Sequence, residues 1–334
     1  MADYVLNMGG YSDYSTHDTV DVFHVTEKSI EHVTGLTLSE PRRNLAAATC
    51  GAYTLAMGGL VDAGSYSNAI DVFRATENGV EAVTGHGLTL SARRDSLAAA
   101  AAGNYIVALG GYDGTNYSNA IDVFRATENG VEAVTGHGLT LSVARSDLVA
   151  VSIGDYIMAL GGKDATNSYN TVDVFRVTQS GVVAVTGHGL TLSTARYNLA
   201  AAACGNYILV MGGKDSGGGK NTIDIFKLTD TGIVKVTDYT LTLSQARSAL
   251  GAAASGEYIL ALGGVGASDF SNVVDMFHVT DDKVERISNP DLSLTTGRSE
   301  LSVAAIDKYI LAMGGYDGSN AFGSSNVVDV FQIV

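Results

Sequence analysis

The stretch Tyr105-Ile106-Val107-Ala108-Leu109-Gly110-Gly111 has six further copies along this 334-residue chain. Such an apolar run is too short for a stable helix, and two glycines after it are typical of a buried strand that enters a tight turn. Each copy begins 49 to 52 residues after the one before, so the repeat has to be interpreted first. The other copies are Tyr4 to Gly10, Tyr53 to Gly59, Tyr156 to Gly162, Tyr207 to Gly213, Tyr258 to Gly264 and Tyr309 to Gly315.

Each repeat contains four segments with the pattern of short strands, which we name a to d in chain order. Strand a is small and apolar, as in Leu148 to Ile153, and strand b is the Tyr segment, as in Tyr156 to Leu160. Alanine-rich copies of strand a could form a helix, but they fall well short of the ~12–15 residues at which such helices become marginal. Strand c, as in Thr171 to Val177, alternates and is β-branched, and strand d, as in Val131 to Val134, follows an Asn-Gly turn.

Composition limits the class of protein. Hydrophobic residues make up 46% of the chain, so a sizeable core is available and a disordered chain is excluded. The net charge of −15 argues against nucleic-acid and membrane partners, because the field of the whole protein would repel nucleic-acid backbones and anionic membrane surfaces. The sequence shows no secretion signal and no apolar segment near the ~18 residues of a membrane span, so we expect a soluble, cytoplasmic protein.

The two cysteines, Cys50 and Cys204, stand in the same column of repeats that are three units apart. That separation is incompatible with the ~4.4–6.8 Å between Cα atoms that a disulfide requires. We therefore expect two free, half-buried thiols, which mildly favours a reducing compartment.

Four short antiparallel strands in each unit of about 51 residues are typical of a β-propeller. Arg-x-x-Leu before strand a, then Tyr-x-x-x-x-Gly-Gly, then Val-Asp-Val-Phe together resemble the kelch repeat, whose matching columns hold an arginine, a Gly-Gly pair and a Val-Glu-Val-Tyr strand. The resemblance covers nearly the whole chain and implies a single all-β, kelch-like propeller domain over residues 1–334. It departs from the family in strand d, where the usual tryptophan is absent and valines such as Val131 would have to fill the space.

The strand count predicts seven four-stranded antiparallel blades with an incomplete junction blade. There are six copies of strands a and d but seven of b and c, because the chain begins at strand b with Asp3-Tyr4 and stops at strand c with Asp329-Val330-Phe331. A six-blade alternative would leave the last b and c strands surplus, with exposed edges. We expect an inner position open near Tyr4 and an outer edge at Val327 to Val334, which could accept a strand from a partner or a second copy.

The strongest candidate for a ligand site is a column of six arginines just before strand a. A closed ring would put these guanidiniums around one mouth of the central channel, where they could bind carboxylates in bidentate fashion. The kelch resemblance implies that this arginine, the serine after it and the aromatic residue after Gly-Gly contact acidic peptides. These columns contain Arg42, Arg94, Arg145, Arg196, Arg247 and Arg298, then Ser146, Ser248 and Ser299, then Tyr11, Tyr112 and Tyr316, and they fail to match at Arg43, Asp95, Tyr197 and Leu60.

A structural role competes with each candidate. Each arginine could instead tie blades together by pairing with a carbonyl or a carboxylate, and Asp147 and Glu300 follow their arginines by two residues. The Asp-Val-Phe aspartates are too regular to mark one site, so we interpret them as structural.

Two further columns could suggest metal. Three histidines share a linker column, but neighbouring blades would hold them about 10 Å apart or more, too far for one zinc ion. The aspartates two positions after Gly-Gly could bind calcium but fit the capping of their own turn better. These residues are His86, His137 and His188, then Asp113, Asp164, Asp215 and Asp317.

No catalytic grouping or phosphate-binding loop stands out, so we expect no enzyme, no cofactor and no metal site. One class of function that remains is a binding scaffold whose loop face around the central channel recognises an acidic protein segment. Another is a carbohydrate or small-ligand propeller with Tyr66 and Tyr117 stacking on a sugar, although the absence of tryptophan weakens it. A third is a nearly ideal repeat protein, engineered or recently duplicated, without a selected ligand, since Tyr66 to Ser91 is identical to Tyr117 to Ser142.

Overall fold

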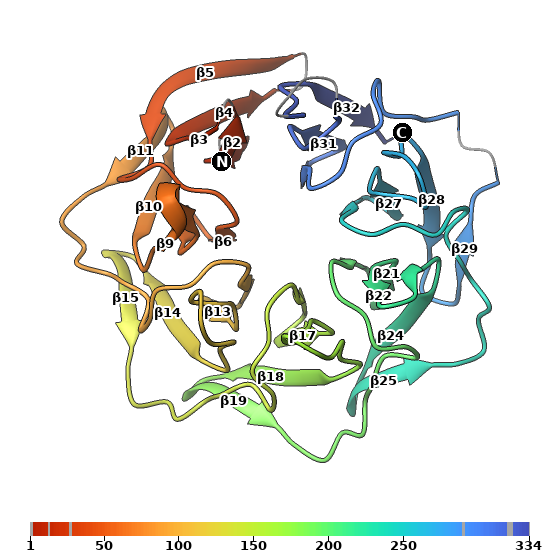
Figure 1. The fold of residues 1–334 in the computed structure, drawn as a ribbon. Coiled ribbons are helices and arrows are strands. Elements are labelled where there is room, and N and C mark those ends of the chain that lie inside the picture. The colour runs from red at the N-terminus through yellow and green to blue at the C-terminus, as the bar shows by residue number, and fades with distance from the viewer. Residues whose placement is uncertain (1–2, 13, 27–28, 289–290, 319–322, 334) are drawn as a thin grey trace. The chain divides into compact units, whose positions relative to one another are not determined.

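A computed structural model describes residues 3–12, 14–26, 29–288, 291–318 and 323–333 of the chain. Within these residues the chain forms seven small antiparallel sheets, five with four strands and two with three, besides two-stranded hairpins in loops (Figure 1). The sheets are the blades of an all-β seven-bladed propeller, so the prediction of seven blades is confirmed and the six-blade alternative is wrong. Two compact units are described separately: unit 1 is Met1–Thr166 with Val172–Gly189, and unit 2 is Asn167–Thr171 with Leu190–Val334.

Unit 1 contains the first four blades, in which consecutive strands pair as antiparallel neighbours. The first blade has no strand a among the described residues, and the other three run from strand a to strand d. Their strands are β1 (Asp3–Met8), β4 (Thr19–Val25) and β5 (Ile30–Thr37); β6 (Ala46–Cys50), β7 (Tyr53–Met57), β10 (Ile70–Thr76) and β11 (Gly79–Val83); β12 (Ala98–Ala102), β13 (Tyr105–Leu109), β14 (Ile121–Thr127) and β15 (Gly130–Val134); β16 (Val149–Ile153), β17 (Tyr156–Leu160), β18 (Val172–Thr178) and β19 (Gly181–Val185).

Unit 2 contains the last three blades, and the seventh blade has no strand d among the described residues. Among the described residues the first blade lacks strand a and the last lacks strand d, which agrees with the expected incomplete junction, with its open inner position near Tyr4 and its outer edge at Val327 to Val334. Val334 lies outside the described residues. The strands are β20 (Ala200–Cys204), β21 (Tyr207–Met211), β24 (Ile223–Thr229) and β25 (Gly232–Val236); β26 (Gly251–Ser255), β27 (Tyr258–Leu262), β28 (Val274–Val279) and β29 (Val284–Arg286); β30 (Ser302–Ile306), β31 (Tyr309–Met313) and β32 (Val328–Gln332).

The core lies between neighbouring blades, and this explains why strand b is apolar at every position. Within β13, Ile106 to Leu109 have 0% relative exposure, because one face packs on the preceding blade and the other on the following blade. Phe124 in β14 is 1% exposed and packs against Leu55 and Met57 of the second blade. Each buried phenylalanine of this kind contributes about 1.5–3 kcal/mol relative to an exposed one.

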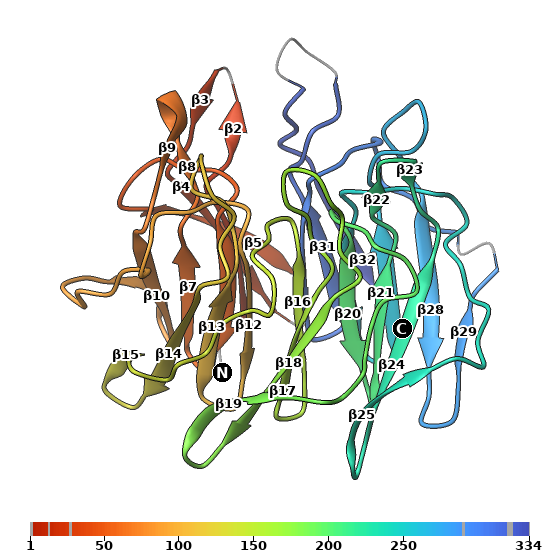
Figure 2. The same ribbon diagram turned by 60° about the horizontal axis from the view of Figure 1, so that its bottom comes forward.

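Short hairpins between strands b and c stand at one end of the blades. In unit 1 they comprise β2 (Tyr11–Ser12) with β3 (Ser15–Thr16), and β8 (Leu60–Val61) with β9 (Ser65–Tyr66), joined by a short 3-10 turn. Figure 2 shows these hairpins at the end of the unit 1 sheets that is opposite the turns between strands c and d. We call this end the b–c loop face of unit 1. No helix in the described ranges is long and apolar enough to cross a membrane.

Candidate binding site

The six arginines of the repeat column are fully buried, each with a relative exposure of 0%. Each guanidinium pairs with the aspartate of the Asp-Val-Phe strand in its own blade, and five of these N–O distances are 2.5–2.8 Å. Desolvation lowers the pKa of Arg42, Arg196 and Arg247, which their aspartates oppose. The pairs are Arg42–Asp71, Arg94–Asp122, Arg145–Asp173, Arg196–Asp224, Arg247–Asp275 and Arg298–Asp329.

These arginines join neighbouring blades, as Arg145 illustrates. Its backbone N–H donates to the carbonyl of Ser118 at 3.0 Å, and its own carbonyl accepts from Gly111 at 2.9 Å, both in the third blade. Its side chain instead reaches into the fourth blade, where it donates to the carbonyl of Ala159 at 3.2 Å and pairs with Asp173. The interpretation that the arginines tie blades together is therefore the one that the contacts support.

One sequence interpretation needs correction here. The carboxylate that neutralises each arginine comes from strand c, and Asp147 and Glu300 do not have this role. Each guanidinium of the arginine column has 0% exposure and a strand c aspartate as its partner, so these contacts are those of a structural role, and the ligand-contacting ring stays a prediction.

The predicted serines and tyrosines come together in one blade only. Ser146, Ser248 and Ser299 are 2–4% exposed, so their hydroxyls lie below the surface. The backbone of Ser299 bridges to that of Tyr316, which is 42% exposed, whereas Ser146 bridges to a lysine and Ser248 to a valine. Tyr11 and Tyr112 are half-buried on the b–c loop face of unit 1.

The histidine and aspartate columns have local structural roles. His86 and His137 each accept a hydrogen bond at 3.0 Å from the N–H two residues further on. Asp113 caps its own turn by accepting from the N–H groups of Thr115 and Asn116, and these backbone bonds hold its pKa below the usual range. Asp164 and Asp215 accept in the same way. Within the described residues, no group of three or more His, Cys, Asp or Glu side chains could hold a metal ion.

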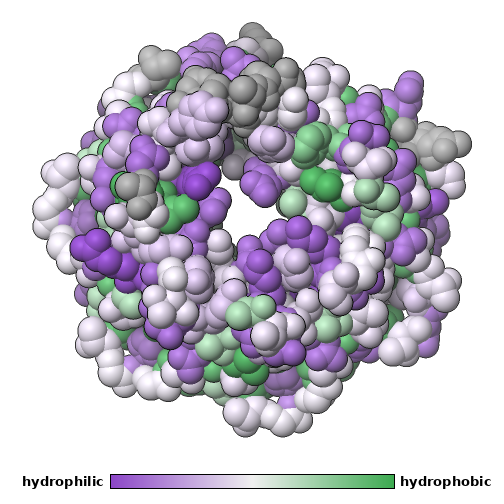
Figure 3. Space-filling view, in the orientation of Figure 1, coloured by the Kyte–Doolittle hydropathy of each residue, from purple (hydrophilic) through white to green (hydrophobic). Residues whose placement is uncertain are grey.

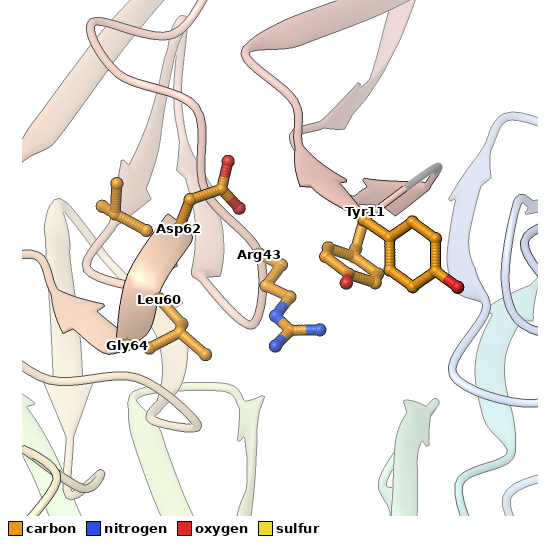
Figure 4. Close-up of a pocket in the computed structure, with 7 residues that line it drawn as sticks. Tyr11, Arg43, Leu60, Asp62 and Gly64 are labelled. Carbon is orange, nitrogen blue, oxygen red and sulfur yellow. The ribbon is translucent and has the colours of Figure 1, made fainter. Parts of the chain in front are cut away.

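A pocket of about 270 Å³ opens on the b–c loop face of unit 1. It lies between the β2–β3 hairpin of the first blade and the β8–β9 hairpin of the second, and Arg43 extends into it (Figure 4). The guanidinium lies over the ring of Tyr11, with 4.2 Å between its central carbon and the ring centroid. We call this site the Arg43 pocket, and it is lined by Tyr11, Tyr14, Arg43, Leu60, Val61, Asp62 and Gly64.

The backbone holds the Arg43 pocket in shape. Arg43 and Leu60 exchange two backbone hydrogen bonds, of 3.0 and 2.7 Å, which fix the arginine beside the β8–β9 hairpin. Asp62 accepts from the backbone N–H of Thr16 at 2.9 Å and so joins this hairpin to β3. Its carboxylate points away from the guanidinium of Arg43 in Figure 4. Both walls of the pocket are thus fixed before any ligand binds.

Within the part of the chain that the structure describes, no ion pair neutralises the charge of Arg43. Nine arginines pair with a carboxylate, whereas Arg43, Arg93 and Arg176 have none within 4.0 Å among the described residues. Asp95, a carboxylate that is 6% exposed and whose pKa burial raises, interacts with Arg43 through its charge without forming an ion pair among the described residues. Strongly hydrophilic surface borders strongly hydrophobic surface near β8 and β9 in Figure 3. The pocket therefore combines a cation with aromatic and aliphatic walls.

Sequence reasoning named Arg43 and Leu60 only as departures from the family pattern. A usable signal was nevertheless present, because Arg43 is the one basic residue in a column that otherwise holds Asp95, Tyr197 and three serines. A cation at a position that is otherwise polar or acidic marks a local change in what the loop face can bind.

A family model described as the KLHDC2/KLHL20/DRC7 Kelch-repeats domain matches residues 1–213 of the chain. A search among curated proteins gave no match. The match covers more than half of the 334 residues and agrees with the seven repeated sheets, their Gly-Gly turns and their buried arginines. The chain belongs to the kelch-repeat family.

Proposed function

We propose that this chain is a non-enzymatic scaffold that binds an acidic segment of a partner protein in the Arg43 pocket. Kelch propellers are a common protein-binding scaffold and are typically non-catalytic. The observation that carries the proposal is the guanidinium of Arg43, which is stacked on Tyr11 in a pocket and has no carboxylate partner among the described residues.

The size of the pocket favours a side chain of a protein over a free small molecule. Pockets for drug-sized ligands and cofactors enclose roughly 300–1,000 Å³. At about 270 Å³ the Arg43 pocket lies at the lower end of this range, a size that suits one side chain with its neighbouring backbone. Among protein side chains, a carboxylate matches the planar guanidinium best because it can accept two parallel hydrogen bonds.

The net charge of −15 sets the expected strength of binding. The overall field repels an acidic segment, so the attraction has to be local and must arise at Arg43 itself. Contacts of this kind weaken as salt shortens the Debye length, from about 10 Å at 0.1 M to about 3 Å at 1 M. We therefore expect weak to moderate, salt-sensitive affinity.

A labelled peptide rich in Glu and Asp, titrated in a fluorescence anisotropy assay, tests the proposal. Arg43→Gln should weaken binding about tenfold or more, since a charge-assisted pair is lost. Arg176→Gln is the matched control, because Arg176 also has no ion pair among the described residues and contacts Tyr156, and its substitution causes the same change of net charge. Equal affinity of both variants, or equal binding of a Gln/Asn peptide of the same length, would refute the proposal.

A second contact is proposed at the outer edge of the seventh blade. Val330 in β32 is 45% exposed, whereas the equivalent Val123 of β14 is 2% exposed beneath strand d of its blade. Among the described residues, β32 pairs with β31 alone. An extended strand from a partner or from a second copy could pair there.

A further inference from the structure

Three tyrosines form a compact cluster next to the Arg43 pocket. The ring of Tyr66 meets that of Tyr112 edge-on, with centroids 5.9 Å apart and planes at 88°. The ring of Tyr117 lies on the other side of Tyr112, with centroids 4.8 Å apart and planes tilted by 40°. All three residues are half-buried, so each is packed below while part of it faces solvent. We call these residues the tyrosine cluster.

The backbone connects the tyrosine cluster directly to the Arg43 pocket. Leu60, which lines the pocket, is the cross-strand partner of Tyr66 in the β8–β9 hairpin. The backbone of Arg43 bridges to Leu60 on its other side. Arg93, a second arginine that has no ion pair with any described residue, donates to the carbonyl of Tyr66 at 3.4 Å. Arg43 and Arg93 therefore both contact the hairpin that carries Tyr66.

The rings are held in place rather than adaptable. A methyl group added at Gly114 would lie 2.5 Å from Cε2 of Tyr66, so this glycine allows the ring to rest against the turn of the third blade. The turn itself is fixed by Asp113, which accepts hydrogen bonds of 2.8 and 2.7 Å from the N–H groups of Thr115 and Asn116. A preformed aromatic surface loses little entropy when a ligand binds.

We infer that the partner segment is both acidic and proline-containing, with its carboxylate at Arg43 and its proline on the tyrosine cluster. This inference rests on the proposed function and adds the chemistry of the neighbouring residue. Proline-rich segments are extended and already ordered, and they dock on aromatic-lined surfaces.

Unit 2 contains the same backbone arrangement without the cations. Phe270 and Tyr316 meet edge-on with centroids 5.2 Å apart, and Gly318 lies against Phe270 as Gly114 lies against Tyr66. The positions equivalent to Arg43 and Arg93 are Ser248, which is 4% exposed, and Gly297. Of these two aromatic contacts, the unit 1 copy is the one that has arginines beside it without an ion pair among the described residues.

The test compares three short peptides by anisotropy: one with alternating Glu and Pro, one with Ser in place of Pro, and one with Gln in place of Glu. Wild-type protein should bind the Glu/Pro peptide about tenfold more tightly than the Glu/Ser peptide, which corresponds to about 1.4 kcal/mol. Tyr112→Leu should abolish this preference, and Tyr112→Phe should keep it because the ring remains. Tyr316→Leu is the matched control, and it should keep the preference because the unit 2 pair has no arginine beside it.

The outcomes separate this inference from the proposed function. Equal affinity for the Glu/Pro and Glu/Ser peptides, both weakened by Arg43→Gln, would overturn the inference and leave the proposed function standing. Absence of any Arg43-dependent binding would overturn both. Binding of an oligosaccharide that Tyr112→Leu abolishes and Arg43→Gln leaves unchanged would also overturn both, in favour of a carbohydrate ligand.

Discussion

Replacing Asp275 by asparagine should strongly destabilise unit 2, because it removes the counter-charge of a buried arginine. The guanidinium of Arg247 has 0% exposure and lies 2.6 Å from Asp275, which is itself 4% exposed. The same guanidinium also donates to the carbonyls of Val273 and Ala261, at 2.6 and 3.1 Å. These two carbonyls remain in Asp275→Asn, but they carry no net charge.

The expected cost is about 3–5 kcal/mol, the range for removing one partner of a buried ion pair. Asp275 also accepts from the backbone N–H of Ser244 at 3.0 Å, and the single carbonyl oxygen of asparagine cannot replace both carboxylate oxygens. The matched control is Arg286→Gln, because Arg286 lies 3.6 Å from the same aspartate but its side chain is 36% exposed. An exposed pair of this kind contributes about 0–1 kcal/mol.

Urea unfolding followed by circular dichroism and tyrosine fluorescence measures both changes. We expect a large fall in the midpoint for Asp275→Asn and almost none for Arg286→Gln. The double variant Asp275→Asn with Arg247→Met should recover part of the loss, since it removes the orphaned charge. If Asp275→Asn costs no more than Arg286→Gln, the assignment of the arginine column to blade stability is wrong.

Four further predictions concern separate features of the chain. Burial raises the pKa of Asp95 in the folded state, so the folded protein binds more protons than the unfolded chain between the two pKa values, and its stability falls as the pH rises through that window. Asp95→Asn should therefore stabilise the protein at about pH 7, and it should stabilise it less as the pH falls below the folded-state pKa. A stability gain that is independent of pH in denaturation curves would contradict this prediction. Gly110→Ala should destabilise far more than Gly136→Ala in thermal melts, since both have φ near +70° but only the former would put a methyl group 2.5 Å from the carbonyl of Arg145. Cys50→Ala should lower the free energy of unfolding by about 1 kcal/mol or less, because alanine already occupies this column in another blade and only a weak S–H contact to the carbonyl of Gly103 at 3.3 Å is lost. A larger loss of unfolding free energy in urea denaturation would show that this contact matters. In hydrogen exchange, β32 should lose protection faster than β18, which is paired on both edges, and equal rates would argue against an open edge.

The fold was largely predictable because each strand carries its own local signal. Strand b was expected at Tyr156 to Leu160 and occupies those residues, and strand c was expected at Thr171 to Val177 and runs over Val172–Thr178. The short alanine-rich segment forms β12, as the glycine after it predicted, although alanine alone favours a helix. Packing between blades favours the strand over a helix, since small side chains allow β12 to contact β6 and β16.

The candidate site was harder to predict because it depends on contacts between distant segments. Arg145 and Arg43 have the same chemistry in the sequence, but Asp173 neutralises the first from 28 residues away and nothing in the described residues neutralises the second. Sequence position could not show this difference, because the pairing requires strand c to fold back beside the start of strand a. The Arg43 pocket likewise needs two hairpins from different blades, joined by Asp62 and Thr16.

The location of ligand contact can be measured most directly by hydrogen exchange with mass spectrometry, in the presence and absence of a saturating Glu/Asp-rich peptide. We predict slower exchange in two segments, residues 10–17 and 58–67, whose amides include those of Thr16 and Leu60 beside the Arg43 pocket. We predict no change in the turns between strands c and d, such as residues 127–130, which lie at the opposite end of the blades. Protection in those turns, with none in the two hairpins, would contradict the assignment of the Arg43 pocket as the binding site.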